Sequence, residues 1–280
     1  MIDASTVLIA LLGHPVEHSL SPRMHNYIYA HAGINSAYLA FDVSPEKLQD
    51  AVNGLRALAA KGFNVTVPHK QSVIPYMDSV DNAAAIIGAV NTVANNNGRL
   101  IGYNTDATGF LRSLEYHNID VKDKSVLVIG AGGAARAVAV ALSMAGARII
   151  ITNRTFEKAD ELANSISSMS SNSLCTAAPL NELKKLDSPY LLVNATSAGM
   201  WPHIETSPLP EDYDLSDVNV AYDLVYNPIK TTFLQEAEKS GCTVVNGLDM
   251  LIFQAIEAIR IWFNSDVLYD IAKNAVKDFA

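Results

Sequence analysis

The sequence of 280 residues contains only two cysteines, Cys175 and Cys242, and only 18% of its residues are charged. The cysteines are far apart and stand in no Cys-x-x-Cys or metal-type spacing, which excludes a disulfide framework and a cysteine-built metal site. A chain of this length buries a large core without such cross-links. The cysteine usage therefore favours a reducing compartment.

An excess of positive charge is also missing, because the formal net charge is -9. This balance argues against a nucleic-acid partner, although a local basic pocket for a small anion remains compatible with it. No apolar run reaches the roughly 18–20 residues of a membrane span. The apolar stretch at residues 5–13 follows only an acidic residue, Asp3, and lacks the cleavage site of a signal peptide. We expect a cytoplasmic protein with no membrane partner.

The sequence does contain apolar segments that alternate with stretches typical of helices. Its length is typical of two domains. In the first hundred residues, Ser21 and Ser44 are candidate N-caps, each followed by proline, and Gly33 is a candidate C-cap. The helices they begin separate three expected strands, which favours parallel pairing. These strands are residues 6–13, 36–43 and 63–67.

A second α/β unit begins near residue 105. The expected helices are 105–118 and 156–167, and residues 130–146 are expected to form a loop and a helix. The expected strands are 125–130, 147–152, 190–196 and 218–225. The serine-rich stretch 165–173 is expected to be a solvated loop. From Lys230 onward the chain is expected to be mostly helical, broken near 241–247, and to pack back onto one of the two units.

A glycine motif follows the apolar strand 125–130. Gly130-x-Gly132-x-x-Ala135 lies directly between that strand and a helix, the context of the dinucleotide-binding Rossmann fingerprint. Gly130 permits a tight turn, Gly132 lets the backbone approach a pyrophosphate, and the helix N-terminus attracts the phosphates. A glycine turn without a ligand is the structural alternative, but the flanking strand and helix favour nucleotide binding.

The end of the next strand bears on which dinucleotide is bound. Enzymes that use NAD usually carry Asp or Glu there, to hold the ribose 2′-hydroxyl. This sequence instead has Asn153, Arg154 and Thr155, with Lys158 one turn later. An arginine fork and a hydroxyl suit a 2′-phosphate, so the sequence favours NADP. The alternative is a solvated Arg154 with Thr155 capping the following helix.

Several short motifs occur in order along nearly the whole chain. They are HSLSPRMHN, NVTVPHK, GAVNT, GYNTDATG, GAGGAARA, NRT, NATSAGM, DLVYNP and NGLDMLIFQA. Together they resemble the shikimate dehydrogenase family, which reduces 3-dehydroshikimate to shikimate in the pathway to chorismate and the aromatic amino acids. The resemblance implies an α/β fold with a substrate-binding domain at 1–105, joined by 240–280, and a Rossmann NADP-binding domain at 106–239.

The resemblance also implies the roles of individual residues. Lys70 and Asp106 match the catalytic pair. The residues implied for substrate binding are Ser19, Ser21, Thr66, Asn91, Asp106, Tyr226 and Gln254. Those implied or expected for cofactor binding are Gly130, Ala131, Gly132, Gly133, Ala134, Asn153, Arg154, Thr155, Lys158, Thr196, Leu224, Gly247 and Met250.

Each assignment has a structural alternative. Lys70 could be a solvated lysine at a strand end, Asp106 and Ser21 could be helix N-caps, and Asn91 could form a turn. The histidines, such as His69, lack metal-ligand spacing, so no metal is expected, and His69 should point away from Lys70.

The chemistry supports the catalytic assignment. Hydride transfer to a carbonyl builds negative charge on oxygen, and a lysine ammonium can stabilise that charge and supply the proton. A nearby carboxylate favours the charged lysine and desolvation opposes it, so we treat Lys70 as an acid–base group without fixing its resting protonation state. We expect an NADP-dependent shikimate dehydrogenase, a monomer or homodimer. The rivals are a broader quinate/shikimate dehydrogenase and a non-catalytic sensor. A quinate enzyme that uses NAD should carry an acid near position 153 or 154, and a sensor should lack Lys70 or Asp106.

Overall fold

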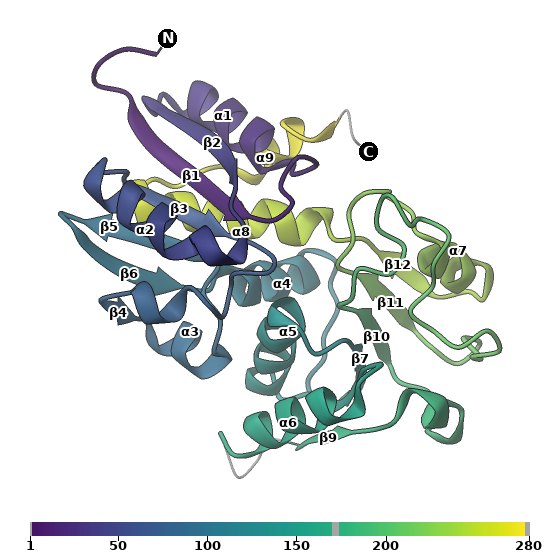
Figure 1. The fold of residues 1–280 in the computed structure, drawn as a ribbon. Helices are drawn as coiled ribbons and strands as arrows, with labels where there is room; N and C mark the ends of the chain where they lie inside the picture. Colours follow the sequence, from purple (N-terminus) through teal and green to yellow (C-terminus); the bar gives the residue numbers. More distant parts are fainter. Residues whose placement is uncertain (1, 170–173, 278–280) are drawn as a thin grey trace. The chain divides into compact units, whose positions relative to one another are not determined.

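The computed structural model describes residues 2–169 and 174–277 and divides into two compact units (Figure 1). Unit 1 comprises Met1–Gly109 and Ile252–Ala280, and unit 2 comprises Phe110–Leu251. Each unit contains a six-stranded sheet with helices packed on it. Within the described residues, no helix is long and apolar enough to cross a membrane.

The elements of unit 1 are β1 Val7–Gly13, α1 Ser21–Ala32, β2 Ser36–Asp42, the 3-10 helix η1 Pro45–Lys47, α2 Leu48–Ala57, β3 Gly62–Val65, η2 Ile74–Tyr76, β4 Ser79–Val80, α3 Asn82–Ile87, β5 Thr92–Asn96, β6 Arg99–Tyr103 and α9 Tyr269–Asn274. Those of unit 2 are β7 Ser125–Ile129, α5 Gly133–Met144, β8 Arg148–Thr152, α6 Phe156–Ser167, β9 Leu174–Ala177, η3 Leu180–Lys185, β10 Leu191–Asn194, β11 Val220–Asp223, α7 Thr232–Lys239 and β12 Thr243–Val245. Two helices cross the unit boundaries, α4 Thr105–Tyr116 and α8 Leu248–Phe263.

The sheet of unit 1 has the order β2-β1-β3-β5-β6-β4 and is mixed. The expected parallel pairing is confirmed for β1 with β2 and with β3, but β5 is antiparallel to both of its neighbours. The β5–β6 hairpin is closed by Asn97 and Gly98, both with positive φ. A two-residue Asn-Gly turn of this kind matches the right-handed twist of the strands.

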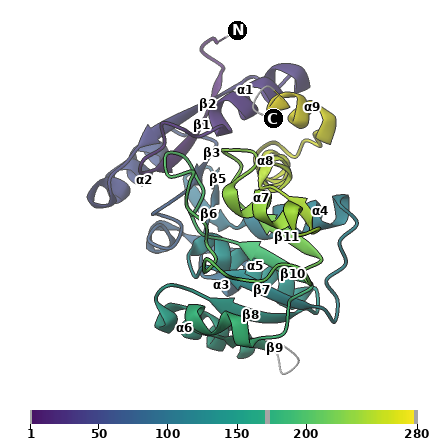
Figure 2. The ribbon, with the colours of Figure 1, turned by 90° about the vertical axis from the view of Figure 1, so that its right-hand side faces the viewer.

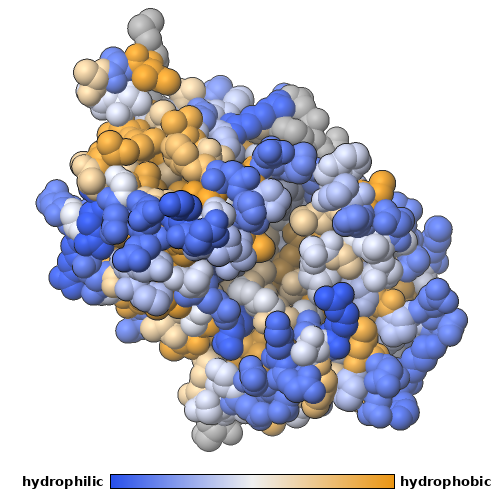
Figure 3. Space-filling view, in the orientation of Figure 1, coloured by the Kyte–Doolittle hydropathy of each residue, from blue (hydrophilic) through white to orange (hydrophobic). Residues whose placement is uncertain are grey.

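Helices cover both faces of this sheet. On one face α2 buries Leu48, Val52 and Leu55 against Ala10 and Leu12 of β1. On the other, α1 packs on β2, and α9 lies beside α1 (Figure 2). At the outer strand β2, Leu39 and Phe41 stay exposed. Apolar surface is also seen over the β1–β2 part of unit 1 (Figure 3).

Two helix starts differ from the sequence expectation. The N-cap of α1 is Leu20, so Ser21 is the first helical residue and not the N-cap. Ser44 does precede a helical segment, but that segment is the 3-10 turn η1, and α2 begins only at Leu48. Gly33 is the expected C-cap, with φ 68°. Strand β3 is also shorter than expected, because it ends at Val65 instead of residue 67.

The sheet of unit 2 is entirely parallel, in the order β12-β11-β10-β7-β8-β9. Its core on one face joins Leu127, Leu192 and Ala221 to Phe233 of α7. On the opposite face, Phe110 of α4 packs edge-on against Tyr222. From β7 the chain continues to β8 on one side of β7, while the later strand β10 pairs with β7 on its other side. The neighbours β7 and β10 therefore form the topological switch point, where nucleotides bind in open α/β sheets.

Strand β12 follows the expected boundary at residue 240, and it pairs with β11 within unit 2. The C-terminal part of unit 1 begins at Ile252, inside α8. The helix expected at 156–167 is confirmed as α6, so the first three residues of the serine-rich stretch are helical. Residues 170–173 of this stretch lie outside the described part of the chain.

Candidate active site

The predicted catalytic residues of unit 1 gather at one edge of its sheet. The strands β3 and β6 end there, and the antiparallel strand β5 begins there. Lys70 follows β3, Asn91 immediately precedes β5, and Asp106 follows β6. The hairpin therefore brings residues from three separate segments of the sequence to one place.

Lys70 and Asp106 form a close ion pair. Lys70 Nζ lies 2.6 Å from Asp106 Oδ2, and the side chains are only 15% and 9% exposed. The backbone carbonyl of Lys70 also accepts a hydrogen bond from Val90 N at 2.7 Å, which anchors the segment that carries the lysine. A solvated lysine would not show this burial, so the structural alternative for Lys70 does not hold.

Asp106 does not cap its helix. Asn104 takes that role, since its Oδ1 accepts from the backbone N–H groups of Asp106 at 3.1 Å and Ala107 at 3.3 Å. The carboxylate of Asp106 is thereby left to accept from Lys70 and, through Oδ1, from Asn91 Nδ2 at 2.8 Å.

Asn91 is likewise more than a turn residue. Its Oδ1 accepts from the backbone N–H of Thr105 at 2.7 Å. Thr105 Oγ1 in turn donates to Gln254 Oε1 at 3.4 Å, which brings the C-terminal segment to the same cluster. The structure thus brings together four predicted residues: Lys70, Asn91, Asp106 and Gln254.

The remaining predicted residues of unit 1 lie on the neighbouring loops. Ser19 Oγ accepts from Ser21 N at 3.3 Å at the start of α1. Thr66 N donates to Leu12 O at 2.9 Å, and a Cβ at Gly13 would come within 2.3 Å of Thr66 Cγ2. Gly13 therefore lets Thr66 lie close to the end of β1.

His69 turns away from Lys70, as expected. It is fully buried, and its Nε2 donates to the carbonyl oxygen of Val43 at 2.6 Å. Among residues 2–169 and 174–277, no group of three His, Cys, Asp or Glu side chains is placed to hold a metal ion.

In unit 2 the glycine motif occupies the switch point. Gly130 has φ +120° and lies so close to the end of β10 that a Cβ would meet Ala195 O at 2.9 Å. A Cβ at Gly132 would meet nothing within 4 Å, so the backbone there is open to a ligand. Gly133 begins α5, and Ala131 and Ala134 flank these positions. This open helix N-terminus fits a dinucleotide pyrophosphate.

The predicted 2′-phosphate residues follow β8. Arg154, Thr155 and Lys158 are exposed, and Asn153 Nδ2 donates to Thr155 O at 2.9 Å. Thr155 is the N-cap residue of α6 but makes no side-chain capping bond. Its hydroxyl is therefore not committed to the helix, and the segment presents two cations and a hydroxyl together.

The other predicted cofactor residues lie at the ends of β10, β11 and β12. Thr196 Oγ1 donates to Asn194 Oδ1 at 2.7 Å. A Cβ at Gly247 would meet Leu224 O at 2.1 Å, so only glycine allows these two backbones to touch. Met250, in the first turn of α8, is buried. Tyr226, predicted for substrate binding, follows β11 in unit 2, and burial raises its pKa.

A buried carboxylate that the sequence reasoning missed holds these strand ends together. Asp223 accepts from Asn194 Nδ2 at 2.9 Å, Val225 N at 3.0 Å and Thr231 Oγ1 at 2.5 Å. Burial raises the pKa of Asp223 to about 6. An acid within the otherwise largely apolar strand expected at 218–225 was the available signal.

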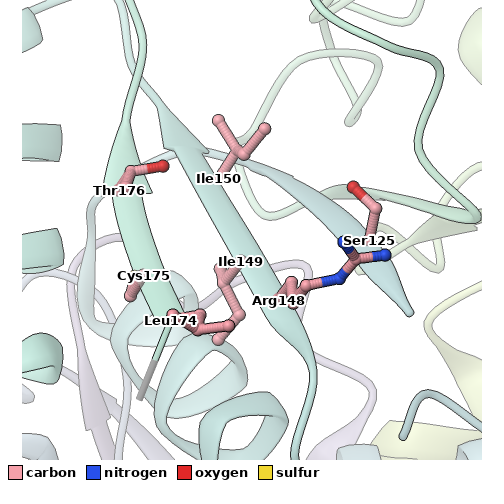
Figure 4. Close-up of a pocket in the computed structure, with 7 residues that line it drawn as sticks. All are labelled: Ser125, Arg148, Ile149, Ile150, Leu174, Cys175 and Thr176. Carbon is pink, nitrogen blue, oxygen red and sulfur yellow. The ribbon is translucent and has the colours of Figure 1, made fainter. Parts of the chain in front are cut away.

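A pocket of about 300 Å³ lies elsewhere in unit 2 (Figure 4). It is lined by the first residues of three parallel strands, Ser125, Arg148 and Leu174. The opposite ends of the same strands carry Gly130 and Arg154. This pocket is therefore distinct from the predicted nucleotide site.

Comparison with known proteins decides the family. The model "Shikimate dehydrogenase substrate binding domain" matches residues 11–93, and "Shikimate / quinate 5-dehydrogenase" matches residues 113–201. The chain belongs to the shikimate dehydrogenase family. A family member from Moorella thermoacetica, named shikimate dehydrogenase (NADP(+)), is 50% identical over 267 residues, covering 93% of this chain and 89% of the relative.

Solved structures of the family agree. A shikimate dehydrogenase in complex with NADP+ has a TM-score of 0.92 and 43% identity, and the match covers 99% of this chain and 97% of the other. The enzyme from Thermus thermophilus in complex with NADP(H) and shikimate has a TM-score of 0.87 and 38% identity, covering 98% and 100%. The predicted family and fold class are confirmed.

Proposed function

We propose that the protein is an NADP-dependent shikimate dehydrogenase that reversibly reduces 3-dehydroshikimate to shikimate in aromatic amino acid biosynthesis. The observation that carries this proposal is the buried pair Lys70–Asp106, held by Asn91. A lysine ammonium at this distance from a carboxylate is oriented for proton transfer to an oxygen. The names of the closely related proteins support the same substrate and cofactor.

We assign substrate recognition to unit 1. In the reducing direction Lys70 supplies a proton to the carbonyl oxygen of the substrate, and Asp106 keeps the ammonium in place. Ser19 and Ser21, at the start of α1, hold the substrate carboxylate as hydroxyl donors. Thr66, Asn91 and Gln254 bind ring hydroxyls.

We assign cofactor binding to unit 2. The bound cofactor supplies or accepts the hydride. The backbone at Gly130–Ala134 binds the pyrophosphate, and Asn153, Arg154, Thr155 and Lys158 bind the 2′-phosphate. Thr196, Leu224, Gly247 and Met250 position the nicotinamide end. Two phosphate-binding cations and the lack of an acid after β8 support NADP over NAD.

Steady-state kinetics with shikimate and quinate, each with NADP and NAD, tests this function. We expect the highest kcat/KM for shikimate with NADP, at least about 100-fold above NAD, because the Arg154 segment makes charge-assisted bonds only to a 2′-phosphate. The broader family description makes quinate the second candidate substrate. A preference for quinate with NAD contradicts the proposal, and turnover of neither acid favours a sensor.

We further propose that the enzyme works in the cytoplasm as a monomer or homodimer, without a nucleic-acid or membrane partner. The two free, buried cysteines support a reducing compartment, and the net charge of -9 argues against a nucleic-acid partner. Light scattering on the purified protein measures the oligomeric state, and a tetramer or larger assembly contradicts the proposal.

A further inference from the structure

Thr92, the first residue of β5, lies directly behind the predicted catalytic cluster. It is fully buried. Its Oγ1 is within hydrogen-bond distance of three groups, Asn64 Nδ2 at 2.9 Å, Asn91 Oδ1 at 3.1 Å and Thr105 Oγ1 at 3.1 Å. A fully buried hydroxyl cannot touch the substrate, so any effect on catalysis must act through these neighbours.

The orientation of the Asn64 amide is fixed by its partners. Asn64 Nδ2 donates to the backbone carbonyl oxygen of Asn91 at 3.0 Å, and a carbonyl can only accept. Tyr38 Oη donates to Asn64 Oδ1 at 2.7 Å on the other side. Thr92 Oγ1 therefore accepts from Asn64, and its single proton is left for Asn91 Oδ1 or Thr105 Oγ1.

The Asn91 amide is fixed in the same way. The backbone N–H of Thr105 can only donate, so it identifies the atom it meets at 2.7 Å as Asn91 Oδ1. Asn91 Nδ2 must then face Asp106 Oδ1 at 2.8 Å. Thr92 holds the oxygen end of this amide while the nitrogen end holds the carboxylate that orients Lys70.

We propose that Thr92 is a positioning residue for the Lys70–Asp106 pair, supported from behind by Asn64 and Tyr38. The inference rests on the proposed function, because it assigns Thr92 to the reaction that this pair performs. Valine at position 92 keeps the shape of threonine but removes the hydroxyl, which leaves Asn64 Nδ2 without one acceptor and loosens the Asn91 amide. Serine keeps the hydroxyl.

The test compares Thr92→Val with Thr92→Ser in shikimate oxidation by NADP. We expect Thr92→Val to lower kcat on the order of tenfold, since small displacements of catalytic groups cost this much or more. The KM for NADP should not change, because the cofactor residues lie in unit 2. Thr92→Ser should recover kcat to within about threefold of wild type. A wild-type kcat in Thr92→Val, or equal losses in both variants, overturns the inference.

A second pair of variants covers the case in which Thr92→Val does not fold. Tyr38→Phe removes the hydroxyl at the far end of the chain of hydrogen bonds, and we expect kcat to fall about threefold. Tyr29→Phe is the matched control, because Tyr29 is also a buried tyrosine of unit 1. Its Oη lies 3.4 Å from His25 Nδ1, which is not part of the hydrogen-bonded series from Tyr38 to Asp106. Equal kcat in the two tyrosine variants overturns the inference.

The wild-type assay separates this inference from the proposed function. A wild-type protein that oxidises neither shikimate nor quinate overturns both. An active wild type with unaffected Thr92→Val and Tyr38→Phe variants overturns only the role of Thr92.

Discussion

At the scale of single residues, the candidate site depends on which side chain caps α4 and which one binds Lys70. Asn104 caps α4, and this frees Asp106 for Lys70. The sequence alone could not choose between a capping and a catalytic Asp106, because the choice depends on a lysine 36 positions away. In the same way Asp223 lies within an expected strand, and only the fold shows its three partners.

Arg154→Gln tests the assignment of the cofactor phosphate. We expect the KM for NADP to rise about 10- to 100-fold while the KM for NAD stays near its wild-type value, because the lost bond is charge-assisted and specific to the 2′-phosphate. Arg148→Gln is a matched control, since Arg148 is exposed at the opposite end of the same strand, β8. Equal changes for both cofactors would contradict the assignment.

Asp223→Asn tests the cost of burying a carboxylate. The pKa of Asp223 is raised from 3.8 to about 6, so above pH 6 the folded state carries an unfavourable buried charge that the unfolded state solvates. We expect the variant to be more stable than wild type at pH 7.5, by up to about 3 kcal/mol. The difference should shrink as pH falls from 6 to 4.

Urea unfolding of both proteins at pH 7.5 and pH 4.5 measures this difference. In the variant, the amide oxygen of asparagine can still accept from Asn194 Nδ2 and Val225 N. Its amide nitrogen can donate to Thr231 Oγ1. A wild type that is clearly more stable than Asp223→Asn at pH 7.5 would show that the ionised carboxylate, rather than its shape, holds the strand ends.

At the scale of elements, the hairpin β5–β6 determines the geometry of unit 1. The sequence contains its signal, Asn97-Gly98 between two apolar segments, but the hairpin was not among the predicted elements. Periodicity did identify β1, β2, β7, β8 and most helices. It missed the strands β4, β9 and β12, and β4 and β12 have only two and three residues, too few to show a period.

Two glycines of unit 1 should respond oppositely to substitution by alanine. Gly54 lies inside α2 with nothing within 4 Å of a Cβ, so Gly54→Ala should stabilise the protein by about 0.5–1 kcal/mol. A Cβ at Gly62 would lie 2.3 Å from Trp262 Nε1 and 2.4 Å from Val93 O. Gly62→Ala should therefore destabilise, by about 1–3 kcal/mol.

Thermal unfolding of the two alanine variants measures these effects. The clash in Gly62→Ala should also break the hydrogen bond from Trp262 Nε1 to Val93 O, which joins α8 to β5 at 2.9 Å. Tryptophan fluorescence reports that change. A Gly62→Ala protein as stable as wild type would mean that Trp262 can move without cost.

At the scale of the whole molecule, the sequence predicted the fold class and the family, and both are confirmed. The ordered motifs made this possible, since together they cover nearly the entire chain. The exact division of the chain could not be predicted, because α4 and α8 each continue from one unit into the other. Within a continuous helix, the sequence has no capping residue or turn that would indicate such a boundary.

The central claim is that the Lys70–Asp106 pair moves the proton while unit 2 binds the cofactor. Lys70→Ala, measured by steady-state kinetics and by calorimetry with shikimate and with NADP, tests it most directly. We expect kcat to fall by about 10³-fold or more, with both ligands still bound within about tenfold of wild-type affinity. Lys47→Ala, at an exposed lysine of unit 1, should match wild type. A Lys70→Ala protein with wild-type kcat would contradict the account.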